Sequence, residues 1–583
     1  MKKFKVVFQP EGKKVPAPAG ITIAALAAEN GVRLEVPCGA VGKCGKCRVE
    51  VSEGRGVTAP DSEETALLSK EEIAKGIRLA CRTKISGNAV ISIPRTSRLQ
   101  TQKILDIGIQ TEVKLAPAVK KIFFKELPKG AGKELLNNTG IYSTADNELL
   151  TVEKGDTTSV LYGMAFDVGT TTVVGTLVDL KTGMVAATAA DMNPQVVYGD
   201  DVISRLNFCI ENKNGLNELN KKVVDVINKL IREACEEAGI MPESIYDIIL
   251  CGNTTMEHLL LKTDPKPLAT YPFVSTLNQS MNKKRVPEAG INVNQKSYVR
   301  VFPVIGGWVG GDTLGVILAT NLYKTAHIKL AIDIGTNGEV VLGNKDRLVA
   351  ASCAAGPAFE GAHIRSGMRA SKGAIEKIDL IDGKIICRTI ENSSPVGFCG
   401  SGLIDAMALL VEHEIVDDTG RIKDKSELPS ELPAEIKEKL VEHDNGNEFV
   451  FTGTISLNQK DVREIQLAKG AMLAGIEILM RELNVKAEDI VEVLLAGAFG
   501  NYIRAEKALA IGLIPQMELK KIIFCGNAAE EGARKALVSV DLGKDVEDIA
   551  RTTKYVDLSS SPLFQDIFAE AMMFQVKTST NDK

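Results

Sequence analysis

Four cysteines form the first group of residues whose type and spacing could do chemistry. They follow the pattern C-x5-C-x2-C-x33-C, at Cys38, Cys44, Cys47 and Cys81. A structural zinc site normally shows two close pairs of cysteines, whereas a [2Fe–2S] cluster takes three close cysteines and a distant fourth. The pattern therefore predicts that these four thiolates hold a [2Fe–2S] cluster, a centre that carries one electron.

The loop that holds the first three cysteines, PCGAVGKCGKC, is rich in glycine. Gly39, Gly42 and Gly45 allow the backbone angles needed to wrap a cluster and let N–H groups approach sulfur closely. A zinc module and metal-free thiols are the alternatives. The other cysteines form no ligand-spaced pair, and buried free cysteine usually behaves as a small hydrophobe. The histidines form no cluster either, so no second metal site is predicted.

Two Asp–x–Gly–Thr stretches form the second group. The candidate residues of the first, AFDVGTTTVVG, are Asp167, Gly169, Thr170 and Thr171. Those of the second, AIDIGTNGEVV, are Asp333, Gly335, Thr336 and Asn337. A tight Gly–Thr turn between two strands offers N–H and hydroxyl groups to phosphate oxygens, and a strand-end aspartate can hold Mg²⁺ through water. Two facing turns would grip a polyphosphate from both sides, with Asp167 and Asp333 as organisers of its Mg²⁺.

A later glycine-containing stretch, LAGAFG, would complete a nucleotide site. Gly497 and Gly500 would let adenine or ribose lie close to the backbone. Rival motifs are absent from the sequence, because no Gly–Lys precedes Ser or Thr and no G-x-G-x-x-G occurs. GFCGSGLID could bind an anion at a helix start, but a close-packing turn explains it at least as well. Asp312 is expected to be an ordinary acidic residue near a helix start.

The elements that must position these residues follow from periodicity. KFKVVFQ alternates like a strand, KKVPAPAG fits its hairpin partner, and ITIAALAAENGVRL fits a short helix. CRVEV and AVISI fit further strands. This order predicts an α+β, ferredoxin-like (β-grasp) domain over residues 1–94, followed by a polar linker over 95–108. Residues 109–162 are predicted to form a small middle segment, either a spacer or a dimerisation module.

Residues 163–583 show an internal duplication. Each Asp–x–Gly–Thr stretch is followed further along the chain by an apolar-periodic helix, at 216–239 and at 463–483. Each helix leads into a buried strand and then into a glycine-containing loop. Two related α/β halves of this kind imply a cleft between them, with the two Gly–Thr turns on its walls.

Composition sets limits on location and partners. Of the 583 residues, 44% are hydrophobic and 25% are charged, and the formal net charge is −5. No basic block occurs, so no nucleic-acid partner is expected. No run of about 18 apolar residues occurs, so no membrane span is expected. The N-terminus, MKKFKVVFQPEGKKV, lacks an apolar signal core, which predicts a cytoplasmic protein.

Together the motifs resemble known families. The spacing of the first three cysteines is similar to that of adrenodoxin-like ferredoxins. The duplicated hairpins make residues 163–583 similar to the actin, Hsp70 and sugar-kinase superfamily, which implies a duplicated, actin-like ATPase domain. The whole chain resembles the reductive activators of corrinoid-dependent proteins, through YGMAFDVGTTTVVGTLVDL, AIDIGTNGEVVLG, GFCGSGLID and LLAGAFGNYI.

The last resemblance implies a function. Members of that family return oxidised Co(II) corrinoid to the Co(I) state that accepts methyl groups, and they consume ATP. By this resemblance the chain would hydrolyse Mg-ATP, bind a corrinoid protein on its actin-like domain, and deliver an electron through its cluster from a low-potential donor. The partner would be a corrinoid/iron–sulfur protein or the corrinoid subunit of a methyltransferase. A homodimer is compatible with the same resemblance.

Three alternatives stay open. A small-molecule kinase could carry an accessory ferredoxin domain, although no acidic residue stands out as the base for a substrate hydroxyl. An ATP-dependent activator of another low-potential metalloenzyme would share the cleft, as in the activators of 2-hydroxyacyl-CoA dehydratases, which hold a [4Fe–4S] cluster between subunits. A duplicated scaffold that has lost its nucleotide would show no ATP turnover.

Overall fold

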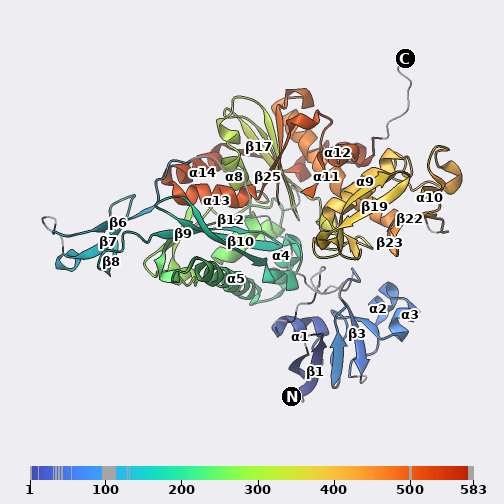
Figure 1. The fold of residues 1–583 in the computed structure, drawn as a ribbon, viewed down its shortest axis with the longest axis horizontal. Helices are drawn as coiled ribbons and strands as arrows, with labels where there is room; N and C mark the ends of the chain where they lie inside the picture. Colours follow the sequence, from blue (N-terminus) through green and yellow to red (C-terminus); the bar gives the residue numbers. More distant parts are fainter. Residues whose placement is uncertain are drawn as a thin grey trace.

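The computed structural model describes most of the chain between residues 3 and 575. Outside the described residues lie 1–2, 11, 31, 33, 35, 37–39, 41, 43, 54–55, 95–112, 128, 130–131, 336, 445, 498–501 and 576–583. The predicted linker over 95–108 falls in that part. Figure 1 shows an N-terminal domain, a small projecting sheet and two larger lobes. Among the described helices, none combines the length and the apolar character needed to cross a membrane.

The N-terminal domain is a five-stranded mixed sheet in the order β2-β1-β5-β3-β4. Its strands are β1 Lys3–Gln9, β2 Lys13–Pro18, β3 Arg48–Glu53, β4 Ile77–Leu79 and β5 Ala89–Ser92. Its helices are α1 Ile23–Glu29, α2 Ser62–Leu67 and α3 Lys70–Ala74. Alternation along β1 buries Val6 and Phe8, and α1 begins where the Thr22 hydroxyl accepts the N–H of Ala25 at 3.1 Å. The predicted ferredoxin-like order of elements is confirmed.

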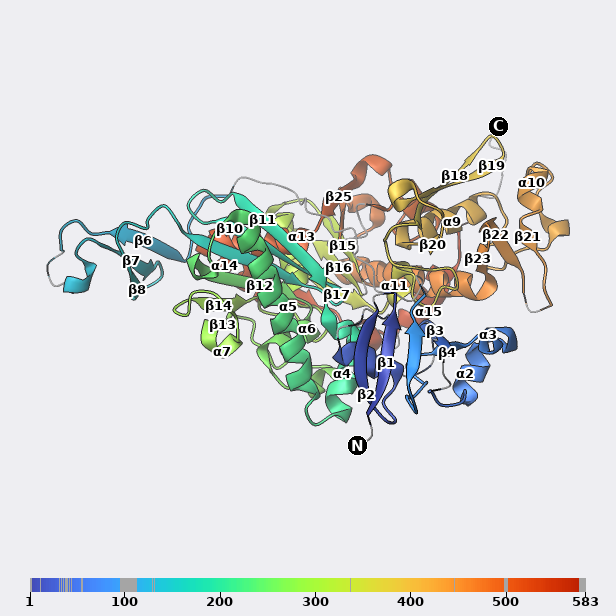
Figure 2. The same ribbon diagram turned by 60° about the horizontal axis from the view of Figure 1, so that its bottom comes forward.

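A small antiparallel sheet follows and projects from the body of the molecule (Figures 1 and 2). Its strands are β6 Val119–Phe123, β7 Asn138–Ser143 and β8 Leu149–Lys154. Val119 and Ile141 are buried at its base and share a core with the first large lobe. The ammonium of Lys121 lies 2.6 Å from the carboxylate of Glu153 and 4.7 Å from the ring centre of Tyr246. One face of the sheet is therefore anchored to the lobe.

The first large lobe is built on a six-stranded sheet in the order β11-β10-β9-β12-β14-β13. Its strands are β9 Tyr162–Val168, β10 Thr172–Asp179, β11 Val185–Met192, β12 Ile245–Gly252, β13 Asn282–Arg285 and β14 Tyr298–Val301. Its helices are α4 Val202–Glu211, α5 Gly215–Ala238, α6 Thr254–Leu261 and α7 Val286–Ala289. The predicted helix over 216–239 is α5, which ends at Gly239 because that residue adopts the left-handed conformation, at φ +68°.

The second lobe has a sheet in the order β25-β24-β15-β16-β17-β26. Its strands are β15 Lys329–Ile334, β16 Gly338–Gly343, β17 Leu348–Cys353, β24 Glu492–Ala496, β25 Ile522–Gly526 and β26 Lys554–Tyr555. Its helices include α11 Gln459–Leu483, α12 Ala505–Ala510, α14 Val540–Thr552 and α15 Phe564–Met572. The predicted helix over 463–483 is part of α11, which begins earlier than expected because Asn458 and Asp461 form a capping box.

An insertion between β17 and α11 adds two small sheets to the second lobe. Its elements are β18 Ala374–Ile381, β19 Lys384–Thr389, β20 Gly397–Phe398, α9 Gly400–Glu412, α10 Ala434–Lys437, β21 Leu440–Val441, β22 Glu448–Thr452 and β23 Ile455–Asn458. GFCGSGLID forms the start of α9. A Cβ added to Gly402 there would lie 2.0 Å from the carbonyl oxygen of Ile375, so this stretch is a close-packing turn.

The two lobes repeat one topology. In each, three strands pair antiparallel and a later strand returns parallel to the first: β9, β10 and β11 with β12, and β15, β16 and β17 with β24. Helices α8 Gly311–Ala319 and α13 Ala528–Val538 pack between the two sheets (Figure 1). The predicted duplicated α/β domain is therefore confirmed. Asp167 and Asp333 lie near the carboxyl ends of the equivalent strands β9 and β15, where α/β sheets commonly bind ligands.

Candidate functional site

Two of the predicted cluster cysteines meet at one end of the β3–β4 pair. Cys47 precedes β3 and Cys81 follows β4, and the N–H of Ala80 donates to the carbonyl oxygen of Cys47 at 2.9 Å. The Sγ atoms of Cys47 and Cys81 lie 3.3 Å apart. Both side chains are buried, and Cys44 is half-buried. Cys38 and Gly39 lie outside the described residues.

This geometry fits a metal–sulfur centre. Cys44, Cys47 and Cys81 are free thiols rather than disulfides. Two sulfurs bound to one tetrahedral metal, with bonds of about 2.3 Å, lie about 3.8 Å apart. The 3.3 Å separation of the Cys47 and Cys81 sulfurs is close to that distance. Thiolates are soft ligands, so the site suits iron–sulfur chemistry better than Mg²⁺ or Ca²⁺.

A buried ion pair supports the chain around Cys81. The guanidinium of Arg78 lies 2.7 Å from the carboxylate of Glu64, and both side chains are buried. The same carboxylate accepts the N–H of Leu79 at 2.8 Å and the hydroxyl of Thr83 at 3.0 Å. Glu64 therefore fixes residues on both sides of Cys81. No sequence pattern indicates this role, because an acidic residue in a short helix usually faces solvent.

The first predicted phosphate turn joins β9 to β10 and is held by buried polar side chains. Asn193 donates to the carbonyl oxygen of Gly169 at 2.9 Å, and Arg205 donates to that of Thr170 at 2.5 Å. Asn253 donates to the hydroxyl of Thr170 at 2.9 Å. Asn193, Arg205 and Asn253 are all buried, so the turn is fixed before any ligand arrives. No motif in the sequence points to these three residues.

Three half-buried carboxylates act on one another electrostatically. Burial, together with the charges of Asp312 and Asp333, raises the pKa of Asp167 to about 8. Burial and the charge of Asp312 raise the pKa of Asp333 to about 7. Burial raises the pKa of Asp312 to about 6. Because each rise reflects the cost of a negative charge, a cation bound among them would lower all three pKa values.

Asp312 has more than the ordinary helix-start role that the sequence suggested. It lies in the first turn of α8 and accepts the N–H of Thr313 at 2.7 Å, as expected there. Its charge also acts on both predicted Mg-ATP aspartates. Within the described part of the chain, no three Asp, Glu, His or Cys side chains could hold a metal ion directly. Mg²⁺ keeps several waters in proteins, so the predicted role of the aspartates is to bind those waters.

The second predicted phosphate turn joins β15 to β16. There the N–H of Gly335 donates to the carbonyl oxygen of Asn337 at 3.0 Å. Gly497 lies directly against Asp333, and a Cβ added to it would be 2.4 Å from Oδ1 of that aspartate, at φ +90°. Only glycine fits this position, so two of the predicted nucleotide residues meet. The predicted residues outside the described part are Thr336 and Gly500.

Two polar contacts join the lobes at this site. Asn527, which follows β25 of the second lobe, donates its side-chain amide to the carboxylate of Asp167 at 3.1 Å. The hydroxyl of Thr171, in the first phosphate turn, donates to the carboxylate of Glu360 in the second lobe at 3.2 Å. The first turn is thus in direct contact with the opposite lobe.

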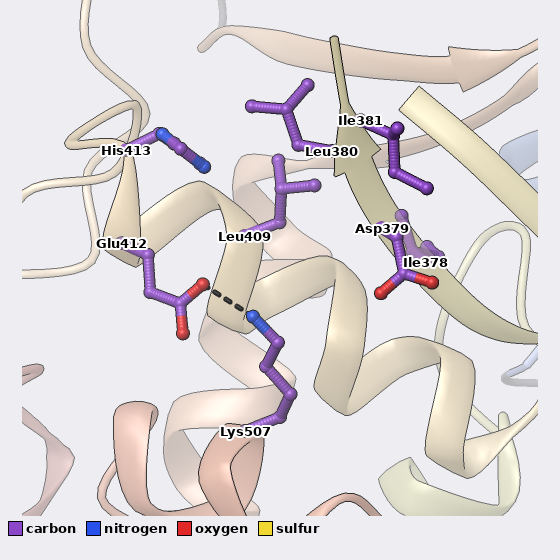
Figure 3. Close-up of a pocket in the computed structure, with 8 residues that line it drawn as sticks. All are labelled: Ile378, Asp379, Leu380, Ile381, Leu409, Glu412, His413 and Lys507. Carbon is purple, nitrogen blue, oxygen red and sulfur yellow. Dashed lines mark hydrogen bonds and ion pairs between the residues drawn. The ribbon is translucent and has the colours of Figure 1, made fainter. Parts of the chain in front are cut away.

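A separate pocket of about 330 Å³ lies in the insertion, between β18 and α9 (Figure 3). Leu380, Ile381 and Leu409 give it an apolar side. The ammonium of Lys507 lies 2.6 Å from the carboxylate of Glu412 at its edge. None of the predicted site residues lines this pocket, so it is distinct from both predicted sites.

Comparisons with known protein families match three stretches of the chain. Residues 6–86 match the family described as a 2Fe–2S iron–sulfur cluster binding domain. Residues 162–325 match the RACo middle region, and residues 327–582 match the C-terminal domain of RACo, described as the ASKHA domain. The three matches follow the order of the predicted ferredoxin-like and actin-like parts.

Relatives that match over most of the chain decide the family. The corrinoid activation enzyme RamQ of Eubacterium limosum is 30% identical over 575 residues, which cover 94% of this chain and 95% of the relative. The chain belongs to the reductive activators of corrinoid proteins. A solved activator, the reductive activator for corrinoid,iron–sulfur protein, is 34% identical, with a TM-score of 0.70 and 98% of each chain covered.

A further relative belongs with these activators. The [Co(II) methylated amine-specific corrinoid protein] reductase of Methanosarcina barkeri is 28% identical over 442 residues, which cover 70% of this chain and 76% of the relative. The predicted resemblance to the activator family and the predicted fold class are confirmed, and the chain is an enzyme of this family. The roles of single residues stay predictions.

Proposed function

We propose that the chain is an ATP-dependent reductive activator, which passes one electron from a [2Fe–2S] cluster to the Co(II) corrinoid of a partner protein and restores Co(I) for methyl transfer. The observation that carries this proposal is the presence of two sites in one chain of the activator family. One is the buried pair Cys47 and Cys81, with sulfurs 3.3 Å apart. The other is the aspartate group between duplicated lobes. The names of the relatives support a corrinoid protein as the partner.

In this proposal the thiolates of the N-terminal domain hold the cluster. They are Cys38, Cys44, Cys47 and Cys81. A plant-type cluster supplies one-electron chemistry near about −400 mV. The chain contributes a loop in which Cys47 and Cys81 are shielded from solvent, supported by the ion pair between Glu64 and Arg78.

The two phosphate turns and the aspartates bind and orient Mg-ATP in this proposal. Turn 169–171 and turn 335–337 offer N–H and hydroxyl groups to the phosphates, while Gly497 and Gly500 leave room for adenosine. Asp167 and Asp333 would hold a hydrated Mg²⁺, which would neutralise charge on the phosphates. The side chains that fix the first turn keep it in position without the ligand, which lowers the entropy cost of binding.

Coupling to ATP has a thermodynamic reason. For one electron, each step of about 59 mV uphill costs about 1.4 kcal/mol. We propose that binding of the activator removes an axial ligand from cobalt and so raises the reduction potential of the Co(II) corrinoid. Nucleotide turnover moves the two lobes during this step. The absorption spectrum of the corrinoid partner, with and without this protein and before any reductant, tests this step. Identical spectra would contradict it.

The remaining partners are proposed on the same basis. A low-potential carrier in the cytoplasm supplies the electron. A second copy of the chain is a further proposed partner, through the small sheet β6–β8, whose outer face leaves Ile122 and Leu149 exposed.

Anaerobic purification followed by three assays tests the proposed function. We expect about two irons and two sulfides per chain for one [2Fe–2S] cluster, together with ATP turnover and ATP-dependent reduction of a Co(II) corrinoid protein. Asp333→Asn should lose turnover and reduction but keep the cluster. Asp346→Asn, an exposed change in the same lobe, is the matched control. Zinc in place of iron, or cobalt reduction that is equal without ATP, would rule the proposal out.

A further inference from the structure

A segment of the second lobe, residues 357–369, connects three parts of the molecule. It begins with the short 3-10 helix Pro357–Glu360. Further along, the N–H of Arg365 donates to Asp461 in the first turn of α11. Its ends contact the first lobe, and its middle contacts the N-terminal domain. These are the parts that an ATP-dependent electron carrier has to coordinate.

The contact with the N-terminal domain comes from within the cysteine loop. Lys46 lies between Cys44 and Cys47, and its ammonium donates to the carbonyl oxygen of Ile364 at 2.5 Å and approaches that of Gly367 at 3.4 Å. Hydrogen bonds from a charged donor are about twice as strong as neutral ones. The residue that reaches the second lobe is thus placed between two predicted cluster ligands.

The surface that receives Lys46 also carries a buried negative charge. The carboxylate of Asp461 is 1% exposed and accepts the N–H of Arg365 at 2.7 Å and that of Asn458 at 3.0 Å. Burial raises the pKa of Asp461, and the ammonium of Lys46 is near enough to oppose that rise. Two carbonyl oxygens, together with this carboxylate, form a surface suited to a lysine ammonium.

Both ends of the segment hold the first lobe. Glu360 accepts the hydroxyl of Thr171 in the first phosphate turn at 3.2 Å. Arg369 lies 3.2 Å from the carboxylate of Asp200. All four side chains are buried, so these interactions are weakly screened by solvent. The segment is therefore joined to the first lobe both at the first phosphate turn and at Asp200.

The N-terminal domain also faces the first lobe. Figures 1 and 2 both show the domain below the junction of the lobes, beside α4 on one side and the β22–β23 hairpin on the other. Its position therefore depends on both lobes.

We propose that segment 357–369 links nucleotide binding to the position of the cluster domain. Without nucleotide, Thr171 bonds to Glu360 and Lys46 holds the cluster loop against Ile364 and Gly367. Phosphate oxygens at the first turn compete for the Thr171 hydroxyl and repel the Glu360 carboxylate. The segment shifts, Lys46 loses its acceptors, and the cluster domain is released toward its partner. This inference rests on the proposed function, because it takes Thr171 as a phosphate ligand.

The docking contact is tested in the full-length, anaerobic protein without nucleotide. Lys46→Gln removes the charge, and Lys75→Gln at the end of α3 is the matched control in the same domain. We expect Lys46→Gln to raise hydrogen exchange of the backbone over 361–369 about tenfold, as expected for loss of a charge-assisted contact. Small-angle scattering should give a larger maximum dimension. Values equal to those of Lys75→Gln would overturn the docking contact.

The link to nucleotide is tested by adding a non-hydrolysable ATP analogue, with its binding followed by calorimetry. In the wild type we expect the analogue to raise backbone hydrogen exchange over 361–369 to the rate that Lys46→Gln shows without nucleotide. Glu360→Gln keeps a hydrogen-bond acceptor for Thr171 but removes the charge that the phosphates repel. This variant should bind the analogue but show a smaller rise in hydrogen exchange over 361–369. Binding without any rise in the wild type would overturn the link and leave the proposed function standing. No binding at all would overturn both, while Lys46→Gln would still decide the docking contact.

Discussion

At the scale of single residues, Gly497 offers a direct test of the nucleotide site. A Cβ there would lie 2.4 Å from Oδ1 of Asp333. We expect Gly497→Ala to displace that carboxylate and to lower ATP turnover about 100-fold, the effect of a misplacement of about 1 Å. Gly453→Ala is the control, because it also has positive φ, +56°, but nothing lies within 4 Å of the added Cβ. Equal losses in both variants would assign the effect to backbone strain.

Cys81 tests the cluster site in the same way. Its sulfur lies 3.3 Å from that of Cys47 and is buried. We expect Cys81→Ser to lose most of the bound iron and sulfide and the visible absorption of the protein, since the hydroxyl is a poor substitute for a thiolate on iron. Cys387→Ser, on β19 of the insertion, should keep both. Full iron content in Cys81→Ser would remove this residue from the ligand set.

Motif spacing identified candidate ligand residues but not the residues that support them. Asp333 and Gly497 were placed in one site by their motifs, and the structure brings them together. Asn193, Arg205 and Asn253 were not found, although they fix the first phosphate turn. They act through hydrogen bonds between distant positions, and a single polar residue carries no periodic signal for such a contact.

At the scale of elements, long periodic segments could be predicted, whereas the short strands of the insertion could not. Helix α5 was predicted almost to its ends, because its apolar positions recur at helical spacing and Gly239 closes it. Helix α11 begins earlier than its apolar pattern, at a capping box around Asn458. The short strands β18–β23 of the insertion depend on pairing with one another, which periodicity does not report.

Lys469, a residue of α11, is expected to make the free energy of unfolding of the protein depend on pH. It is fully buried in that helix, donates to the carbonyl oxygen of Met573 at 2.5 Å, and lies 4.9 Å from the ring centre of Phe574. Burial lowers its pKa to about 7, from an ordinary value of 10.5. Between these values the unfolded chain binds more protons than the folded one, so stability rises with pH by up to about 1.4 kcal/mol per unit. Below pH 7 both states are protonated and this dependence disappears.

Lys469→Met tests that dependence by removing the titrating group. From pH 7.5 to 9.5, we expect the free energy of unfolding of the wild type to rise relative to the variant by about 2 kcal/mol. Urea unfolding of the full chain at both pH values measures the difference. Lys460→Met, at an exposed position of α11, should follow the wild type. Parallel pH profiles for Lys469→Met and wild type would show that Lys469 titrates normally.

At the scale of the whole molecule, the parts could be predicted and their placement could not. The cysteine pattern and the duplicated turns each predicted a domain. The contact of Lys46 with Ile364 and the contact of Thr171 with Glu360 lie between those domains. Contacts of this kind depend on how folded surfaces meet, and one sequence carries no repeat or spacing that reports them. They are also the contacts through which one site could act on the other.

The exposed apolar face of the small sheet β6–β8 predicts that the molecule forms a homodimer. Ile122 and Leu149 are 38% and 37% exposed and lie on one face, because Ile122 pairs with Gly140 and Leu149 pairs with Tyr142. We expect a homodimer through this face in sedimentation experiments. The double variant Ile122→Glu and Leu149→Glu should be a monomer, since burying two unpaired charges costs several kcal/mol. Met184→Glu, at a 69% exposed position of the first lobe, should stay dimeric. A wild type that sediments as a monomer, or a double variant that stays dimeric, would exclude this face as the interface.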